Sequence, residues 1–447
     1  MTASFRFVAP VSTNAAILRA ADPEVAAAMD GEAHRQESQL VLIASENYAS
    51  PAVMAAQGSV ATNKYAEGYP DRRYYGGCQN VDVMEKLAIE RACRIFGAVH
   101  ANVQPHSGST ANMAVYDACV EPGSVILGMQ LAAGGHLTHG HQASFSGKRY
   151  QPVQYGVNSA TGLIDLNEIE SLAKTHKPAM IVVGASAYSH DFDYAAIRGI
   201  ADGVGAVFWV DMAHPAGLIA AGLLNNPLPW ADIVSTTTHK TLRGPRGGML
   251  LLGRDRDNPL GLKTAGKTPR IKRLSEVIDS VNMPGNQGGP LMHVIAAKAV
   301  AFGEVLQDSF QDYGRAVIAN ARSLAAGLME LGYHVVSGGT DNHVFLVDLR
   351  TKHAELPGKE AERILGQAGI DLNANMVPGD TQGPFNPSGI RIGTAALTSR
   401  NMGVEEMRLI AGWIDQVLSH PTDEALRVSI LAQVNELTAQ FPMYREV

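Results

Sequence analysis

Two segments that each follow an apolar run contain a candidate catalytic residue. Asp211 follows the apolar run 204–210, and Lys240 follows the run 231–234 and three threonines. Catalytic groups of α/β proteins gather at the carboxyl ends of strands. A lysine there can form a Schiff base with an aldehyde cofactor, and an aspartate can keep a pyridinium nitrogen protonated. Either residue alone would be typical of a surface loop, but the pair favours a pyridoxal phosphate enzyme.

A phosphate site is indicated by Ser107, Gly108 and Ser109, which follow the short extended segment 102–105 and precede a helical pattern. Small residues at a helix N-terminus let backbone N–H groups and hydroxyls converge on an anion. Simple helix capping is the alternative explanation for the same residues.

Three histidines lie close together in the glycine-flanked segment 131–141. The neighbouring glycines would allow His136 to stack flat on a pyridine ring. His136, His139 and His141 could also suggest a metal site, but neither a carboxylate nor a cysteine joins them at ligand spacing. We therefore expect no metal here.

Two further features fit a binding site. The segment 65–77 concentrates tyrosines, arginines, glycines and Glu67 without the periodicity of a core element, and such loops usually line binding sites. Arg391 lies inside the apolar strand pattern 388–394. A substrate carboxylate is a natural bidentate partner for its guanidinium group, and a structural salt bridge is the alternative.

The composition argues against several classes of protein. The chain has 447 residues, 46% of them hydrophobic, and a formal net charge of −7. This length predicts at least two domains, and the scattered positive charges argue against nucleic-acid binding. Three cysteines make no disulfide framework, and residues 1–20 lack the profile of a signal peptide. Because no apolar run approaches the ~20 residues that span a bilayer, we expect a cytoplasmic protein without a membrane segment.

The elements that must position the reactive residues alternate along the chain. Apolar runs predict buried strands, and amphipathic patterns predict the helices between them. The strands are expected at 124–127, 179–183 and 206–210, and the helices at 22–38, 81–96, 166–176 and 194–203. Such alternation is typical of an α/β fold with a mostly parallel sheet covered by helices.

The composition shifts after the glycine- and proline-rich segment 284–290. A long helical stretch at 293–331 then leads to strands near 333–336 and 344–348. We expect an N-terminal arm at 1–30, a large domain at 31–309 and a smaller α+β domain at 310–447.

Six segments resemble serine hydroxymethyltransferase and occur in the same order, in a likeness that extends from about residue 25 to 440. They are 45–48, 62–70, 104–109, 134–140, 236–240 and 337–343. The resemblance implies the fold type I architecture of aspartate aminotransferase, with a mixed, mostly parallel central sheet and a smaller C-terminal domain. It also implies a homodimer with shared active sites, and pairing of dimers into a tetramer stays open.

The cofactor implied by this resemblance is pyridoxal 5′-phosphate, bound covalently to Lys240. Asp211 would pair with its pyridine nitrogen and His136 would stack on its ring. Ser186 and His214 would contact the side of its phenolic oxygen. The residues expected around its phosphate are Ser107, Gly108, Ser109 and, from the neighbouring subunit, Tyr65 and Gly289.

The implied substrates are L-serine, glycine and tetrahydrofolate. Arg391 would bind the amino-acid carboxylate with Ser45 close by, and Glu67 and Tyr75 would face the serine hydroxyl and the folate from the neighbouring subunit. Glu67 is the expected acid/base. The other residues expected to take part in catalysis are Tyr65 and His239. The folate pocket is expected to contain Leu131, Gly135, Leu137, Tyr74, Asn375 and Phe385.

Several positions depart from the family's usual pattern. Ala374 stands where lysine is usual, Met283 where an aromatic residue is usual, and Ala133 where histidine is frequent. Asn386 and Pro387 replace a common Val-Thr pair. A 2-methylserine hydroxymethyltransferase and a folate-independent aldolase acting on β-hydroxy amino acids are therefore alternatives. A non-catalytic paralogue that binds partners or RNA is a further alternative, against which the intact cofactor residues argue.

Overall fold

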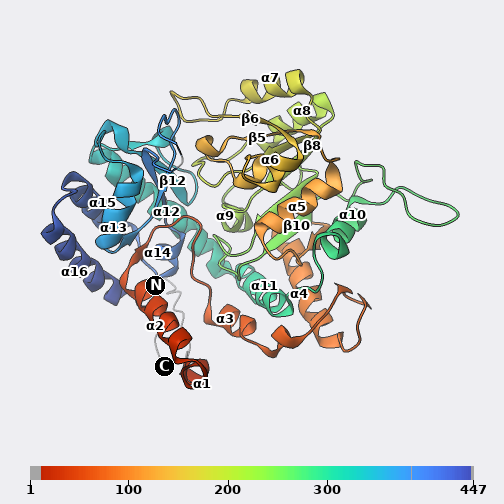
Figure 1. The fold of residues 1–447 in the computed structure, drawn as a ribbon, viewed down its shortest axis with the longest axis horizontal. Coiled ribbons are helices and arrows are strands. Elements are labelled where there is room, and N and C mark those ends of the chain that lie inside the picture. Colours follow the sequence, from red (N-terminus) through yellow and green to blue (C-terminus); the bar gives the residue numbers. More distant parts are fainter. Residues whose placement is uncertain (1–11, 384, 444–447) are drawn as a thin grey trace. The chain divides into compact units, whose positions relative to one another are not determined.

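The computed structural model describes residues 12–383 and 385–443. It divides the chain into two compact units, Ala52–Gly314 and the described parts of Met1–Pro51 with Arg315–Val447. We call them the large and the small unit (Figure 1). Among the described residues, no helix combines the length and the apolar character needed to cross a membrane.

A seven-stranded sheet forms the centre of the large unit. Its strands are β4 (His100–Asn102), β5 (Val125–Met129), β6 (Gln151–Tyr155), β7 (Met180–Val183), β8 (Val207–Asp211), β9 (Ile233–Thr237) and β10 (Gly248–Leu252). They follow the order β4-β10-β9-β8-β7-β5-β6. Only β10 runs antiparallel to its neighbours, β4 and β9, in this sheet. The prediction of a mixed, mostly parallel sheet is therefore confirmed.

Both faces of this sheet are buried. On one face, Met180 and Trp209 pack with the apolar sides of α5 (Gly108–Cys119) and α10 (Leu274–Ser280). Ile181, whose side chain points to the opposite face, is also fully buried. Parallel strands that are buried on both faces consist of nearly continuous apolar residues, which explains the unbroken apolar runs in the sequence.

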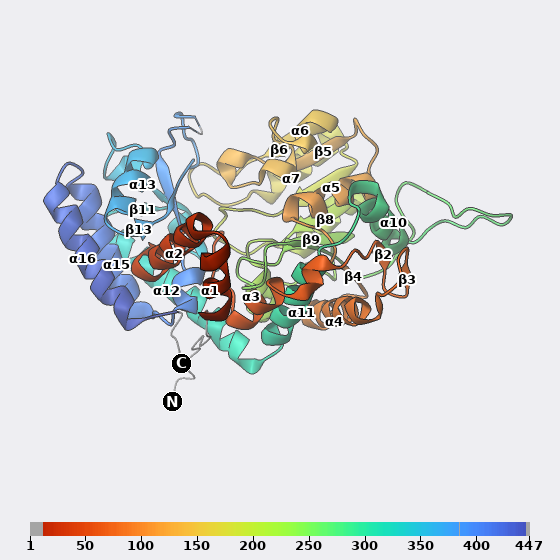
Figure 2. The same ribbon diagram turned by 60° about the horizontal axis from the view of Figure 1, so that its bottom comes forward.

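The remaining helices of the large unit surround the sheet (Figure 2). They are α3 (Pro51–Gln57), α4 (Gln79–Phe96), α6 (Phe145–Arg149), α7 (Leu166–His176), α8 (Tyr194–Val204), α9 (Ala216–Ala220), α11 (Met292–Val305) and the start of α12 (Asp308–Glu330). The strands β2 (Gly68–Tyr69) and β3 (Arg72–Arg73) form a short antiparallel hairpin. The predicted helices at 81–96, 166–176 and 194–203 correspond to α4, α7 and α8.

The predicted long helical stretch at 293–331 is divided into two helices, α11 and α12. Leu306 caps α11, with its N–H bonded to the carbonyl oxygens of Phe302 and Glu304. The N–H of Phe310 then bonds to the carbonyl oxygen of Gln307 and starts a new turn. The apolar pattern continues across this break, so periodicity alone could not reveal it.

The small unit contains a four-stranded antiparallel sheet and a short parallel pair. The sheet has the order β11-β12-β15-β14, and the pair is β1-β13. The strands are β1 (Leu40–Val41), β11 (His334–Val335), β12 (Val344–Asp348), β13 (Ile370–Asp371), β14 (Asn373–Asn375) and β15 (Gly389–Gly393). The helices are α1 (Ser12–Ala21), α2 (Pro23–Ser38), α13 (Gly358–Gln367), α14 (Ala395–Ser399), α15 (Val404–Ser419), α16 (Glu424–Gln440) and the rest of α12.

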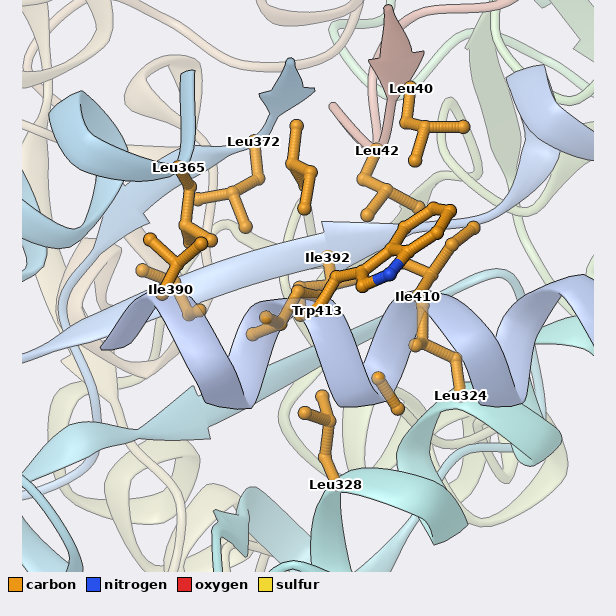
Figure 3. Close-up of a cluster of buried hydrophobic side chains, with 14 of the residues drawn as sticks. Leu40, Leu42, Leu324, Leu328, Leu365, Leu372, Ile390, Ile392, Ile410 and Trp413 are labelled. Carbon is orange, nitrogen blue, oxygen red and sulfur yellow. The ribbon is translucent and has the colours of Figure 1, made fainter. Parts of the chain in front are cut away.

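The predicted large domain, 31–309, included residues 31–51, but these residues belong to the small unit. The core of the small unit explains why. Leu40 and Leu42 lie in one apolar cluster with Ile392 and Trp413 (Figure 3). In addition, β1 is hydrogen-bonded to β13. The predicted boundary at residue 30 is also wrong, because it falls inside α2. The side chains that determine this assignment lie more than 300 residues farther along the chain.

Candidate active site

Asp211 ends the central strand β8 and is almost fully buried. Its Oδ2 accepts hydrogen bonds from His139 Nε2 (3.0 Å) and Asn112 Nδ2 (2.9 Å), and its Oδ1 accepts one from the N–H of Ala213 (3.1 Å). Burial acts to raise the pKa of Asp211, but the hydrogen bond from His139 and the nearby positive charges hold that pKa far below its usual range. The protein therefore keeps a buried anion at this strand end.

His136 belongs to the same hydrogen-bonded cluster. It caps the short 3₁₀ turn Leu137–His139, and its Nδ1 lies 2.7 Å from Thr138 Oγ1. Thr138 Oγ1 also accepts a hydrogen bond from Asn112 (2.8 Å), which links His136 to the partners of Asp211. The imidazole rings of His136 and His139 lie 5.6 Å apart.

This cluster corrects one premise of the sequence-based argument against a metal. The candidate ligand atoms of His136, His139 and Asp211 all lie within 4.8 Å of one another. A carboxylate therefore does join the histidines, although it comes from a different strand. The facing atoms of His139 and Asp211 are already hydrogen-bonded to each other, which gives His139 a positioning role.

Lys240 follows β9 and is 8% exposed. The loop that carries it closes on itself, because the N–H of Thr238 donates to the carbonyl oxygen of Gly247 (3.1 Å) and Thr238 Oγ1 donates to that of Pro245 (2.6 Å). Burial, together with nearby cations, lowers the pKa of His239 to about 3. His239 is therefore neutral at physiological pH beside the lysine.

The loops after β8 and β9 are bonded to each other. Thr241 Oγ1 donates to the carbonyl oxygen of His214 (2.7 Å) and accepts from the N–H of Gly217 (2.8 Å). His214 itself is 4% exposed. Since β8 and β9 are adjacent parallel strands, Asp211 and the loop of Lys240 lie at the same edge of the sheet, as predicted.

Helix α5 begins at Gly108, with Ser107 as its N-cap. Ser107 Oγ accepts from the N–H of Thr110 (3.2 Å), and Thr110 Oγ1 accepts from the N–H of Ser107 (3.0 Å). A Cβ on Gly108 would lie 2.7 Å from Thr237 Cγ2, so the helix starts directly against the end of β9. Ser109 is exposed. First-turn N–H groups have no partner inside a helix, so a capped start can also bind an anion.

Ser186 ties the segment before His136 to the end of β7. Its hydroxyl donates to the carbonyl oxygens of Gly134 (3.3 Å) and Gly135 (3.0 Å). A Cβ on Gly135 would lie 2.1 Å from the carbonyl oxygen of Met129, so only glycine fits there. The chain that presents His136 is thus held close to the sheet.

Tyr65, Glu67 and Tyr75 form one group on the surface of the large unit. Tyr65 OH donates to Glu67 Oε1 (3.2 Å), and the rings of Tyr65 and Tyr75 meet edge to face at 5.3 Å. Glu67 raises the pKa of Tyr75. Gly288 and Gly289 lie beside them, because a Cβ on either glycine would come within 3.1 Å of Glu67 or Tyr65. Tyr65 and Tyr75 remain 56% and 50% exposed in the single chain.

Arg391 lies in β15 of the small unit. Its Nε donates to Asn373 Oδ1 (2.9 Å), and burial lowers the pKa of Arg391 to about 10. A Cβ on Gly393 would lie 2.4 Å from the Cα of Ala44, so the chain that leads into Ser45 lies against the end of β15. A guanidinium group held in this way suits the bidentate binding of an anion.

The residues expected in the folate pocket are divided between the units. Leu131, Gly135, Leu137 and Tyr74 belong to the large unit, and Asn375 and Phe385 belong to the small unit. Leu137, Tyr74 and Phe385 are 45%, 70% and 91% exposed. Large exposed side chains of this kind can be covered by a ligand or by another subunit.

Two residues whose hydrogen bonds reach the site or the segments beside it were not predicted from the sequence. Asn112 in α5 bonds both to Asp211 and to Thr138. Lys298 in α11 is 1% exposed and donates to three backbone carbonyl oxygens. A lysine in the midst of the apolar stretch 295–301 was the signal that could have identified the second of them.

The large unit has the groups that pyridoxal phosphate needs. A buried carboxylate with a depressed pKa suits a protonated ring nitrogen, and a buried lysine at the next strand end suits an aldehyde. The start of α5 suits a phosphate dianion. The residues present therefore fit this cofactor.

Comparison with known proteins gives the same answer. A family model described as serine hydroxymethyltransferase matches residues 18–414. "Serine hydroxymethyltransferase 1" of Pseudomonas aeruginosa is 55% identical over 96% of this chain and 98% of its own length. "Serine hydroxymethyltransferase" of Methylococcus capsulatus is 55% identical over 95% of this chain and 97% of its own. With its fold type I sheet and a site that fits pyridoxal phosphate, this chain belongs to the serine hydroxymethyltransferase family.

Proposed function

We propose that this protein transfers a hydroxymethyl group reversibly between L-serine and tetrahydrofolate, which gives glycine and 5,10-methylenetetrahydrofolate. Family membership supports the reaction and its substrates. The observation that carries the proposal is the buried anion Asp211 on the strand next to the one that leads to Lys240.

Pyridoxal 5′-phosphate, when bound, withdraws electrons from the α-carbon of the amino acid. Lys240 is its proposed covalent attachment. Asp211 would stabilise positive charge on the ring nitrogen, and His136 would stack on the ring. The residues proposed to bind its oxygens are Ser107, Gly108, Ser109, Ser186 and His214.

Glu67 is the proposed acid/base for the proton of the hydroxymethyl group. Its carboxylate is hydrogen-bonded to Tyr65 and lies beside Tyr75, so a proton has short routes to and from it. We further propose that a second copy of the chain covers this exposed group in a homodimer. Tyr65, Glu67, Tyr75 and Gly289 would then contribute to the site of the partner subunit.

Arg391 is the proposed partner of the amino-acid carboxylate, with Ser45 as a neighbour. The bond from Arg391 Nε to Asn373 fixes the orientation of the guanidinium group, which supports this assignment. His239 is proposed to act as a neutral group beside Lys240. The folate is proposed to contact Leu131, Gly135, Leu137, Tyr74, Asn375 and Phe385.

Borohydride reduction after loading with pyridoxal phosphate tests the cofactor assignment. The parent and the surface variant Lys174→Ala should retain the cofactor irreversibly, and Lys240→Ala should not. Serine turnover with and without tetrahydrofolate then tests the reaction. Turnover of 2-methylserine in preference to serine, or cleavage that ignores folate, would replace the proposed reaction with one of its alternatives.

A further inference from the structure

Lys298 is a buried lysine that the proposed reaction does not use. It lies in the middle of α11, and its side chain is surrounded by protein. Its Nζ donates to the carbonyl oxygens of Val103 (2.6 Å), Pro105 (3.2 Å) and Gly248 (2.8 Å). Three carbonyl dipoles thus converge on one nitrogen.

The three carbonyls belong to the two chain segments that frame the proposed cofactor site. Val103 and Pro105 lead into Ser107, the N-cap of α5. Gly248 follows the loop of Lys240 and starts β10. The N–H of Gly248 also donates to the carbonyl oxygen of Pro105 (3.0 Å), so the ammonium reinforces an existing junction.

The charge state of Lys298 follows from this geometry. An ammonium has three N–H donors, one for each carbonyl, whereas a neutral amine has only two. Burial lowers the pKa of Lys298 to about 7, and Glu85 acts in the opposite direction. The carbonyl oxygens favour the charged form further, because only the ammonium can donate to all three of them at once.

Close packing holds the lysine in place. A Cβ on Gly247 would lie 2.5 Å from Lys298 Cε and 2.9 Å from Nζ. Only a residue without a side chain leaves room for the lysine at this point. Gly247 also accepts the hydrogen bond from Thr238 that closes the loop of Lys240.

We propose that Lys298 serves as a tethered monovalent cation, which holds the turn before Ser107 and the loop of Lys240 in the arrangement that pyridoxal phosphate needs. The inference rests on the proposed function, because that function makes these two segments a cofactor site. Lys298 is a positioning residue in this scheme. Removing its side chain would leave a cage of three carbonyl oxygens, and such a cage can accept a free ammonium or potassium ion.

The test measures the affinity of apo-protein for pyridoxal phosphate by equilibrium titration in LiCl, KCl or NH₄Cl at one ionic strength. Lys298→Ala should bind the cofactor at least about tenfold more weakly in LiCl, since it loses several charge-assisted hydrogen bonds. KCl or NH₄Cl should restore part of the affinity. The parent and Lys174→Ala, which removes a surface lysine, should bind equally well in all three salts.

Gly247→Ala provides a second variant that keeps the charge and displaces the lysine. It should also weaken cofactor binding, whereas Gly199→Ala should not, because a methyl group at 199 meets no atom within 4 Å. Thermal unfolding shows which variants are folded. If Lys298→Ala does not fold, the cofactor affinity of Gly247→Ala decides the matter. Unchanged affinity in the folded variants, or a loss in Lys298→Ala that is equal in every salt, overturns the proposal. A parent that binds no pyridoxal phosphate instead overturns the proposed function.

Discussion

At Asp211, burial and hydrogen bonding act in opposite directions on the same carboxyl group. Removal from water favours the neutral acid, whereas His139, Asn112 and the backbone favour the anion. The second effect dominates, because three donors surround two oxygens. Asp211 therefore stays ionised over the whole pH range in which an enzyme of this kind would work.

Asp211→Asn should leave the fold intact and reduce kcat by at least ~10²-fold, because an amide cannot stabilise a protonated ring nitrogen. Steady-state kinetics with serine and tetrahydrofolate measure the effect. Asp202→Asn changes an exposed aspartate in α8 and serves as the control. Near-normal turnover of Asp211→Asn would place the partner of the ring nitrogen elsewhere.

Arg391→Ala should raise KM for serine strongly, because the carboxylate loses a bidentate, charge-assisted partner that contributes about 2–4 kcal/mol. Arg391→Lys should recover only part of the loss, since a point charge cannot reproduce the planar fork. Serine KM for both variants checks this expectation. An unchanged KM in both would make the arginine structural.

His239 should make the apo-protein sensitive to acid. Its folded-state pKa of about 3 lies below the ordinary value of 6.5, so the unfolded chain binds an extra proton between these two pH values. Stability should therefore fall as the pH decreases from about 6.5, by about 2 kcal/mol at pH 5. His239→Gln should reduce the shift in unfolding midpoint between pH 8 and pH 5. If the exposed control His176→Gln has the same effect, the shift does not arise at His239.

At the scale of elements, two adjacent strand ends become one site because their loops are bonded together. Thr241, in the loop after β9, donates one hydrogen bond to His214 and accepts another from Gly217, both in the segment after β8. The N-terminus of α5 is brought against β9 at Gly108, where any larger residue would collide with Thr237. The positions of Asp211 and Lys240 therefore depend on contacts made by residues with no chemical role of their own.

Thr241→Val keeps the shape of this side chain and removes both hydrogen bonds. Two buried backbone groups would lose their partner, which should cost about 1–3 kcal/mol of stability. Affinity for pyridoxal phosphate should fall as well, since the loops of Lys240 and His214 separate. Denaturant unfolding and cofactor titration measure the two effects, with the exposed Thr175→Val as the control. A stable variant with normal affinity would show that this link does not position the site.

At the scale of the whole molecule, the small unit is assembled from both ends of the chain. Leu40 and Leu42 complete a core whose other members come from the C-terminal part. Tyr65, Tyr74 and Tyr75 remain exposed on the large unit, which is consistent with the proposed homodimer. The cytoplasmic location stays a prediction from composition.

Mixing Lys240→Ala subunits with Glu67→Gln subunits tests the shared site. Each parent variant should be nearly inactive, because each lacks one essential group. If Glu67 acts across the interface, a mixed dimer contains one complete site out of two. Activity should then return to about half of the normal value per mixed dimer, or about a quarter for a random one-to-one mixture. Subunit exchange is verified by native mass spectrometry. Confirmed exchange without recovered activity would contradict the shared geometry.

The sequence by itself determined the elements whose signals are local. Continuous apolar runs predicted β5, β7 and β8, and amphipathic patterns predicted α4, α7 and α8. Small residues after an extended segment predicted the start of α5 at Gly108. The order of these elements also predicted that Asp211 and the loop of Lys240 share one edge of a parallel sheet. Periodicity and helix capping depend on residues that are near neighbours in the chain, so both can be recognised from the sequence alone.

Only the tertiary structure decided the contacts that give these residues their properties. Asn112 and His139 bond to Asp211 from 99 and 72 residues away, and Lys298 reaches Val103 across 195 residues. The assignment of residues 40–42 to the small unit depends on β13 and on the core near Trp413. Such contacts form when elements pack, and they leave no periodic trace in the segments that they join. Burial and hydrogen bonding then shift the pKa values, which is why the charges of Asp211 and His239 could be assigned only after folding.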